Sequence, residues 1–373
     1  MSLETLNPSK PQFREATNLL RGICAFSILV WHYQHFFYAG TNAIDFEEKA
    51  QPFFQYLDIF YRFGNLAVPI FWCISGLVIT HTHINNSEIS ARNFLTARVA
   101  RLYPIHLLTL IVVVILQIIS NYKYNEFQIY SENDLYHFVL NLFFIQSWGF
   151  GRGYSFNYPT WSVSVEIIVY VIFFLILKKI QKFRIFSALV VWVVCMIINS
   201  RSDRVFSKLF FLECLEYFAA GMIIYFVVEK INKQGMGVQK LIINLVIFMS
   251  ILSARFLDVL VFDTGAKAWS LAMIYFVFIA AQIDGTIFAR QFKKIKLFGD
   301  LSYSVFLWHI PIQISIKMIF PSSKVSDSYE TSNLFFAFYL IVTYLVGYFS
   351  FKFIEQPAQR YLRQKLMSSS RIG

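Results

Sequence analysis

Long apolar stretches separated by short polar loops run through most of the chain, and stretches of this length are typical of membrane-spanning helices. Ten runs fit the pattern, at residues 17–39, 64–82, 102–120, 160–177, 185–199, 207–228, 241–261, 268–284, 301–320 and 333–352. A further run at 135–148 is short and contains His137, Asn141 and Gln146, which favours a re-entrant or interfacial position. We therefore predict an all-α polytopic membrane protein with about ten transmembrane helices plus one short re-entrant or interfacial helix.

The basic residues of the loops predict the orientation of these helices. With ten crossings, the basic segments KKIQKFR (178–184), VEKINKQGMGVQK (228–240) and ARQFKKIK (289–296) share one side with both termini. Cytoplasmic loops are enriched in Lys and Arg, so this side is expected to be the cytoplasm. An eleventh crossing would place all three segments outside. Residues 1–16 lack a signal-peptide pattern, and we expect a cytoplasmic tail there, one membrane domain at 17–354 and a second cytoplasmic tail at 355–373.

Composition agrees with a membrane protein and removes several other classes. The chain is 57% hydrophobic and only 15% charged, with a mean hydropathy of +0.54, which excludes an ordinary soluble globule. The net charge of +11 is concentrated in short loops, and we do not expect nucleic-acid binding. The four cysteines show neither disulfide nor metal-ligand spacing, so no metal site is expected.

The first apolar run contains the most conspicuous polar pair. Arg21 and His32 are eleven residues apart, which places them three turns and about 16 Å apart on one face of a helix. The arginine then lies at the inner membrane boundary and the imidazole near the middle of the bilayer. An ionisable group at that depth is costly unless it is paired or hydrated, so His32 is a candidate functional residue.

Other polar residues are expected at compatible depths. Arg98 and Arg101 are three apart and share a face if their segment is helical, with Pro104 then in a first helical turn. Ser162 and Glu166 share a face of the helix at 160–177, and Glu166 is a plausible partner for His32. Ser302 and His309 are seven apart in a later helix.

Together these motifs resemble the acyltransferase 3 family of bacterial integral-membrane O-acyltransferases. The similarity extends from about Phe13 to Arg360 and rests on six motifs in the family's order. These are Arg21-x10-His32, FWCISGLVI (71–79), RVARLYP (98–104), WSVSVE (161–166), LSYS with a histidine at 309, and Glu355-x-Pro357. The chain differs in having Ile167 where relatives often carry a second acidic residue.

The resemblance implies acetyl-CoA as donor, a carbohydrate acceptor, free or lipid-linked, and a location in the bacterial inner membrane among its lipids. We expect His32 to act as general base, with Glu166 orienting it, because an imidazole can take the proton of a hydroxyl. Arg98 and Arg101, together with Arg21, are expected to bind the donor's phosphates. Trp161, Ser162 and His309 are further candidates.

Three alternatives remain open at this level. In a ping-pong mechanism, His32 would itself carry the acetyl group. In a proton-coupled secondary transporter, His32 and Glu166 would form a proton relay, although the internal repeats typical of such transporters are not apparent. A membrane glycosyltransferase would require a large soluble loop, and the loops are short. The identity of the acceptor, the acyl group and the oligomeric state are not determined by the sequence.

Overall fold

The computed structural model describes residues 15–43, 46–86, 90–200, 210–233, 244–246, 249, 266–284, 286, 288–320 and 329–368. Within them the fold is all-α apart from one two-stranded antiparallel hairpin, β1 (Tyr38–Ala39) and β2 (Asn42–Ala43). The longer helices are α1 (Glu15–Trp31), α2 (Phe54–Phe63), α3 (Ala67–His83), α4 (Ala91–Tyr124), α5 (Leu135–Leu142), α6 (Trp161–Phe183), α7 (Ile185–Ser200), α8 (Phe210–Lys233), α10 (Ala266–Ile283), α13 (Ser302–Ile319), α14 (Asn333–Ser350) and α15 (Gln356–Ser368). Shorter pieces are α11 (Ala289–Phe292), α12 (Lys296–Asp300) and several 3₁₀ or π segments, of which His32–Phe37 and Phe351–Glu355 matter below.

Five helical stretches among the described residues are long and apolar enough to cross a membrane: Phe54–His83, Ala91–Tyr124, Tyr158–Phe183, Phe210–Lys233 and Asn333–Leu362. Ile185–Asn199 and Leu271–Ile283 are apolar but shorter. The chain is therefore a multi-pass helical membrane protein, as predicted, while a count of ten spans is not established. Most of the expected span at 241–261 lies outside the described residues. The short run at 135–148 contains only eight α-helical residues in α5, too few to span a bilayer.

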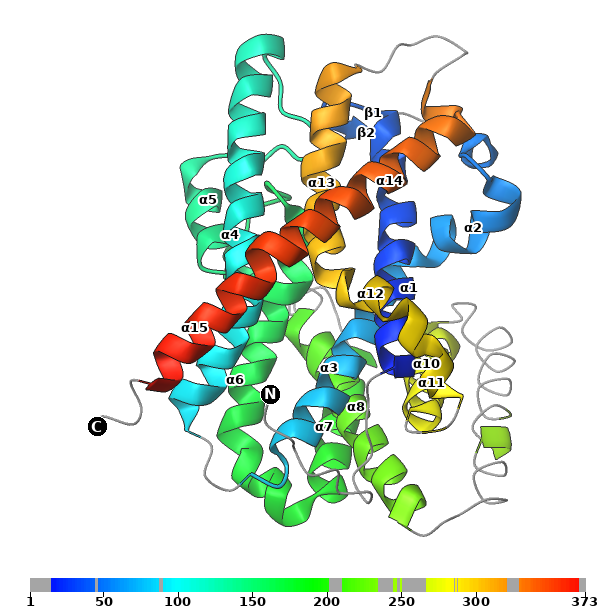
Figure 1. The fold of residues 1–373 in the computed structure, drawn as a ribbon, viewed down its shortest axis with the longest axis vertical. Helices are drawn as coiled ribbons and strands as arrows, with labels where there is room; N and C mark the ends of the chain where they lie inside the picture. Colours follow the sequence, from blue (N-terminus) through cyan, green and yellow to red (C-terminus); the bar gives the residue numbers. More distant parts are fainter. Residues whose placement is uncertain are drawn as a thin grey trace.

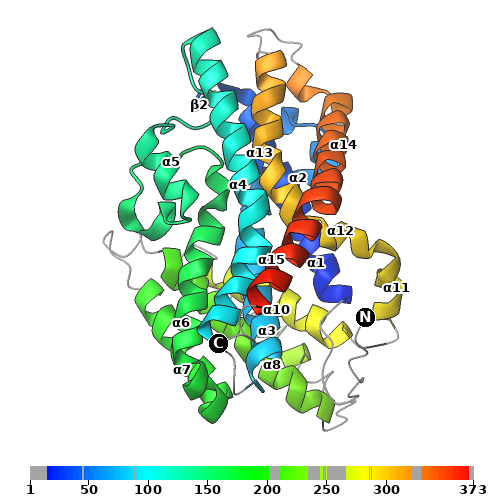
Figure 2. The same cartoon turned by 60° about the vertical axis from the view of Figure 1, so that its left-hand side comes forward.

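The long helix α4 runs through most of the length of the molecule and gives it two recognisable ends (Figures 1 and 2). We call the end where α4 begins, and where α6 and α8 finish, the arginine end. The opposite end, where α4 and α13 finish near the β1–β2 hairpin, is the hairpin end. α13 packs against both α4 and α14, whereas α3, α7 and α8 form the part of the bundle near the arginine end (Figure 1).

The helix predicted at 17–39 changes type in its second half. The α-helix ends at Trp31 and the chain continues as a 3₁₀ helix from His32 to Phe37. A 3₁₀ helix has three residues per turn, so residues three apart lie directly above one another. His32, His35 and Tyr38 therefore follow one side of this segment, an alignment that an α-helix would not give.

α4 is longer than the predicted run at 102–120, and Pro104 is not in its first turn. The helix begins at Ala91, where the hydroxyl of Ser90 caps it by accepting a bond from the Asn93 amide at 3.2 Å. Pro104 is thus in the helix interior. With the helix continuous through 98–101, Arg98 and Arg101 are fixed on a rigid element.

α3 and α8 cross in close backbone contact because each has a glycine at the crossing. A Cβ atom on Gly76 would collide with the carbonyl of Phe218, and one on Gly221 would collide with the carbonyl of Cys73. Small residues permit this close packing between membrane helices.

Replacing Gly76 with alanine is expected to destabilise the protein by about 1–3 kcal/mol, the usual cost of overpacking a tight interface. The obstructing atom is a backbone carbonyl, which cannot rotate away. The measurement is the apparent Tm of the purified protein in detergent. Gly22→Ala is the matched control, because its new methyl group would meet only the half-buried ring of Phe298. Equal Tm values for the two variants would contradict the role of the crossing.

A buried carboxylate from another part of the chain stabilises the first turn of α1. Asp284, directly after α10, accepts bonds from the amides of Ala16 (2.6 Å) and Thr17 (3.2 Å) and from the Thr17 hydroxyl. These amides belong to the first turn of the helix, which has no intrahelical acceptors for them. Asp284 thereby fixes the start of the helix that carries Arg21.

Candidate functional site

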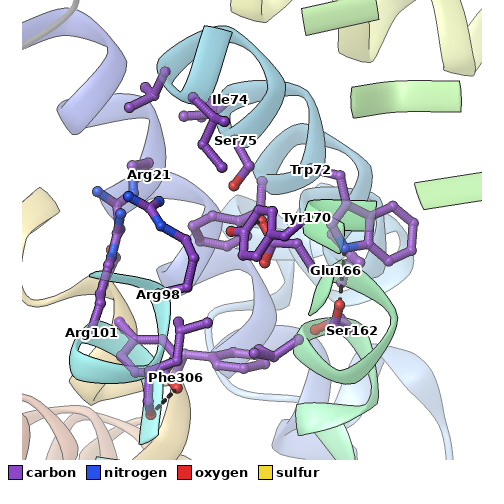
Figure 3. A pocket seen from close by; sticks show the side chains of 18 of the residues that line it. Arg21, Trp72, Ile74, Ser75, Arg98, Arg101, Ser162, Glu166, Tyr170 and Phe306 are labelled. Carbon is purple, nitrogen blue, oxygen red and sulfur yellow. Dashed lines mark hydrogen bonds between the residues drawn. The ribbon is translucent and has the colours of Figure 1, made fainter. Parts of the chain in front are cut away.

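A cavity of about 810 Å³, including its open mouth, lies among α1, α3, α4, α6 and α13. Figure 3 shows the side chains that line it. Its polar lining consists of three arginines, one carboxylate, three serines and two tyrosines: Arg21, Arg98, Arg101, Glu166, Ser75, Ser162, Ser302, Tyr170 and Tyr303. The remaining lining is apolar and includes Ile28, Trp72 and Phe306.

The arginines give the cavity an excess of positive charge. Arg21 from α1 and Arg98 and Arg101 from α4 face it, against the single carboxylate of Glu166 among the lining residues (Figure 3). No hydrogen bond or ion pair joins the guanidinium of Arg21 or Arg101 to any described residue. Arg98 lies over the ring of Tyr170, with its Cζ atom 5.8 Å from the ring centroid. Such a group of guanidinium ions is suited to an anionic ligand, because the planar fork matches phosphate or carboxylate oxygens.

Glu166 is held on the opposite wall by hydroxyl groups. The Tyr170 hydroxyl, one turn further along α6, donates to its Oε1 at 2.6 Å, and the Ser75 hydroxyl points to the same carboxylate (Figure 3). Arg98 and Arg101 add electrostatic attraction. The carboxylate therefore belongs to the arginine cavity.

Several bonds hold α13 against this cavity. The Tyr303 hydroxyl donates to the Leu102 carbonyl of α4 at 2.8 Å, and Asn157 donates to the Leu307 carbonyl at 2.8 Å. The Ser304 hydroxyl donates to Glu355 at 2.5 Å, in the segment that joins α14 to α15. These links explain what the LSYS and Glu-x-Pro motifs do in the fold: they fix the position of the helix that carries His309.

Three histidines form a second cluster, one helical turn beyond the cavity. The His32 ring lies 4.8 Å from that of His309 and 5.0 Å from that of His35, measured between centroids. His32 follows the lining residue Ile28 by four positions, and His309 follows Phe306 by three. All three histidines are buried, and His32 retains the largest exposed fraction, 9%.

The backbone fixes the tautomers of the central pair. His32 Nδ1 bonds the Ile28 carbonyl at 3.1 Å, and His309 Nδ1 bonds the Phe306 carbonyl. A carbonyl can only accept, so in each ring the Nδ1–H donates and the Nε2 of the neutral ring carries the lone pair. The buried His309 Nε2 has no hydrogen-bond partner among the described residues. Each of these two neighbouring rings thus retains one basic nitrogen.

Gln313 joins this pair to the third histidine. Its side-chain oxygen accepts from His35 Nδ1 at 3.0 Å, while its amide donates to the His32 carbonyl at 2.9 Å. Both His35 and Gln313 were missed in the sequence. The 3₁₀ segment and the four-residue spacing of His309 and Gln313 on α13 are the features that bring them together.

The residues expected from the sequence divide between these two clusters. Arg21, Arg98, Arg101, Ser162 and Glu166 all line the cavity, whereas His32 and His309 meet beyond it. The expected pairing of Glu166 with His32 is not among the contacts of the described residues, where the nearest imidazole partner of His32 is His309.

Ser162 and Trp161, two of the expected site residues, make contacts within the helix packing. The Ser162 hydroxyl donates a hydrogen bond to the Pro159 carbonyl at 3.1 Å, and the Ser162 carbonyl accepts one from Trp72 Nε1 at 3.1 Å. Trp161 packs its ring against Trp72 and Phe210 and does not line the cavity. Within α6, Ser162 therefore contributes to the wall, and Trp161 supports it from behind.

One group in the described part of the chain has the composition of a metal site: Glu132, Asp134 and His137. His137 Nδ1 already bonds Asp134 at 2.7 Å, and the Arg152 amide donates to His137 Nε2 at 3.3 Å. Both ring nitrogens are occupied by protein groups, and Asp134 and His137 together stabilise the start of α5, where Asp134 is also the N-cap.

Comparison with known proteins agrees with the motifs. A family model described as an acyltransferase domain matches residues 14–352. No curated protein and no solved structure matches. The matched segment contains both the arginine cavity and the histidine cluster, and it covers nearly the whole chain. The protein therefore belongs to the acyltransferase 3 family of membrane acyltransferases.

Proposed function

We propose that the protein is an O-acetyltransferase that moves the acetyl group of acetyl-CoA to a hydroxyl of a carbohydrate acceptor. The observation that carries the proposal is the arrangement of the two clusters. A cavity with three arginines lies one helical turn from a histidine pair whose basic nitrogens are left available by the backbone. Transfer from acetyl-CoA requires a binding site for this anionic donor and a general base for the acceptor hydroxyl.

The donor would bind with its phosphates against the arginines. Arg21 and Arg101 supply the guanidinium groups that no described side chain uses, and Arg98 stands beside Tyr170 on the same wall. The narrow pantetheine arm then passes the apolar residues Ile28 and Phe306 and presents the thioester near His32. Glu166, held by Tyr170, limits the positive charge of the cavity and keeps the wall in place.

In the proposed reaction, His32 Nε2 takes the proton of the acceptor hydroxyl as its oxygen attacks the thioester carbonyl carbon. The C–O bond forms, the C–S bond breaks, and the imidazolium returns the proton to the leaving thiolate. His309 lies beside His32 and stabilises the imidazolium through its own Nε2 lone pair. The chemistry needs no metal ion.

We infer the membrane orientation from the loop charges. The arginine end would face the cytoplasm, where acetyl-CoA is found, and both termini would lie on that side of the bacterial inner membrane. The basic segments 178–184, 228–240 and 289–296 support this orientation. The acceptor, a surface polysaccharide or lipid-linked glycan, would approach from the hairpin end.

The direct test compares surface glycans from cells with and without the protein by mass spectrometry, together with acetyl transfer by the purified protein. A hydroxyl-linked acetyl group that depends on the protein is the expected result. Isolation of an acetylated enzyme without acceptor would indicate the ping-pong route through His32. Proton-coupled solute uptake into vesicles, with no acetyl transfer, would instead favour the transporter alternative.

A further inference from the structure

A line of buried polar residues continues along α13 from the histidines to the hairpin end. His309, Gln313 and Lys317 follow one another at four-residue intervals on the same face of the helix. Lys317 is only 3% exposed. A buried ammonium group in a membrane protein is expensive, so its presence points to a ligand or a function.

The Lys317 side chain lines a second cavity, separate from the one that contains the arginines. This hairpin-end pocket has a volume of about 450 Å³, including its mouth, and is lined by Tyr38, Ala39, Gly40, Tyr124, Glu126, Gln128 and Lys317. The Lys317 ammonium donates one bond to the Tyr38 carbonyl at 2.6 Å. An ammonium group has three N–H donors, and the described residues provide no acceptor for the other two.

The backbone conformation also shapes the acidic side of the pocket. Gly40 has a φ of +56°, and a Cβ atom there would collide with the Glu126 carboxylate, so glycine allows this carboxylate to lie against the hairpin. The Gln128 amide donates to the Ser120 hydroxyl at 3.2 Å, and its backbone is tied to Gln117 by two bonds, at 2.8 and 3.0 Å. Glu126 and Glu330 both attract Lys317 electrostatically. The pocket thus combines fixed donors and acceptors with the rings of Tyr38 and Tyr124.

The pocket is connected to the histidine cluster through the 3₁₀ segment. The Tyr38 ring is 5.1 Å from that of His35, which lies 5.0 Å from His32. On the other wall, Gln313 bonds His35 and lies one turn from Lys317. The two sides form a continuous polar path from the hairpin-end pocket to the proposed base.

We propose that the hairpin-end pocket binds a sugar ring of the acceptor. Lys317 donates to ring hydroxyls, Glu126 accepts from them, and a tyrosine ring covers the apolar face of the sugar. A phosphate is disfavoured because the Glu126 carboxylate lines the pocket and Glu330 also acts electrostatically on Lys317. The inference rests on the proposed function and extends it, since it assigns the acceptor subsite.

The distance to the histidines defines the class of acceptor further. Lys317 follows His309 by eight positions, about 12 Å along the helix axis, which is more than one sugar ring spans. The ring in this pocket is therefore a neighbour of the ring that is acetylated. The subsite selects acceptors of at least two sugars.

The test measures acetyl transfer from labelled acetyl-CoA to methyl maltoside, methyl lactoside and methyl cellobioside, with protein purified in a detergent that has no sugar headgroup. Lys317→Met, which keeps the shape of the side chain, and Glu126→Gln, at an exposed residue, are expected to raise the KM for the disaccharide at least tenfold. The KM for acetyl-CoA should not change. Lys49→Met removes an exposed charge from the short 3₁₀ helix Glu48–Ala50 after the hairpin and should leave both KM values unchanged.

The outcomes separate this proposal from the proposed function. Unchanged disaccharide KM values in both pocket variants overturn the subsite. Wild-type protein that binds acetyl-CoA but neither binds nor acetylates any of the three disaccharides also overturns it, while the proposed function stands. Failure to bind acetyl-CoA overturns the proposed function itself. Two results would support the subsite and also distinguish the acceptor. A lower KM for dodecyl maltoside than for methyl maltoside identifies a lipid-linked glycan as the acceptor, and equal KM values identify a free glycan.

Discussion

His32→Gln is expected to lower the rate of acetyl transfer by about 100- to 10,000-fold, the contribution typical of a positioned general base. Glutamine has a similar length and can still donate to the Ile28 carbonyl, to which His32 Nδ1 is now bonded. It has no basic nitrogen to take the proton of the hydroxyl. The loss should therefore appear in kcat, with little change in the KM for acetyl-CoA, because His32 does not line the arginine cavity. Steady-state kinetics of the purified protein measure both constants.

His81→Gln provides the matched control, since His81 is half-buried on α3 and lines neither cavity. Its kcat should equal that of the wild type. His309→Gln should cause a smaller loss than His32→Gln if His309 only stabilises the imidazolium. A His32→Gln protein with more than a tenth of the wild-type kcat, folded and inserted normally, would contradict the role of His32 as base.

The membrane class of the fold follows from the sequence because apolar length is a local property. The runs that became α3, α4, α6, α8 and α14 are recognisable without knowledge of their neighbours. The helix boundaries also depend on local signals outside the apolar runs. Ser90 caps α4 well before the apolar run begins, and the helix then includes Pro104. The sequence does not predict the change to a 3₁₀ helix at His32, whose carbonyl accepts a bond from Gln313 of α13.

The cavity residues were largely predictable, and the histidine cluster was not. Arg21, Arg98, Arg101 and Glu166 were assigned to compatible depths, and they do line one cavity. Depth alone, however, does not determine which helices are adjacent. Their similar depth predicts a pairing of Glu166 with His32, whereas α13 places His309 beside His32. The neighbour of a residue in a helical bundle depends on helix order, which apolar periodicity does not encode.

Gln313 and Lys317 show a second reason why part of the site was missed. Each is flanked on both sides by apolar residues of α13 or by a single serine, and such residues often only link neighbouring helices. The informative feature is their shared spacing with His309, which the structure extends to the hairpin-end pocket. A polar residue every fourth position in a membrane helix is therefore a better indication of a site than any of the residues alone.

Arg101→Gln is expected to raise the KM for acetyl-CoA by about 10- to 100-fold, with a smaller effect on kcat. Hydrogen bonds to a charged group contribute about 1.5–3 kcal/mol, and each 1.4 kcal/mol is about a factor of ten in affinity. Arg101 is suited to measure this contribution, because no described residue forms an ion pair or hydrogen bond with its guanidinium. Its removal therefore costs a ligand contact without breaking a hydrogen bond or ion pair of the fold.

Arg101→Lys and Arg92→Gln make the result specific to the arginine cavity. Lysine keeps the charge but not the two-pronged guanidinium, so Arg101→Lys should fall between the wild type and Arg101→Gln. Arg92 is exposed in the first turn of the same helix and does not line the cavity, so its loss should leave the KM unchanged. Binding of acetyl-CoA should also weaken as salt concentration rises, and less steeply in Arg101→Gln, because one cationic contact is missing. Equal KM values for Arg101→Gln and Arg92→Gln would mean that the donor's phosphates bind elsewhere, since a guanidinium in contact with them cannot be removed without loss of affinity.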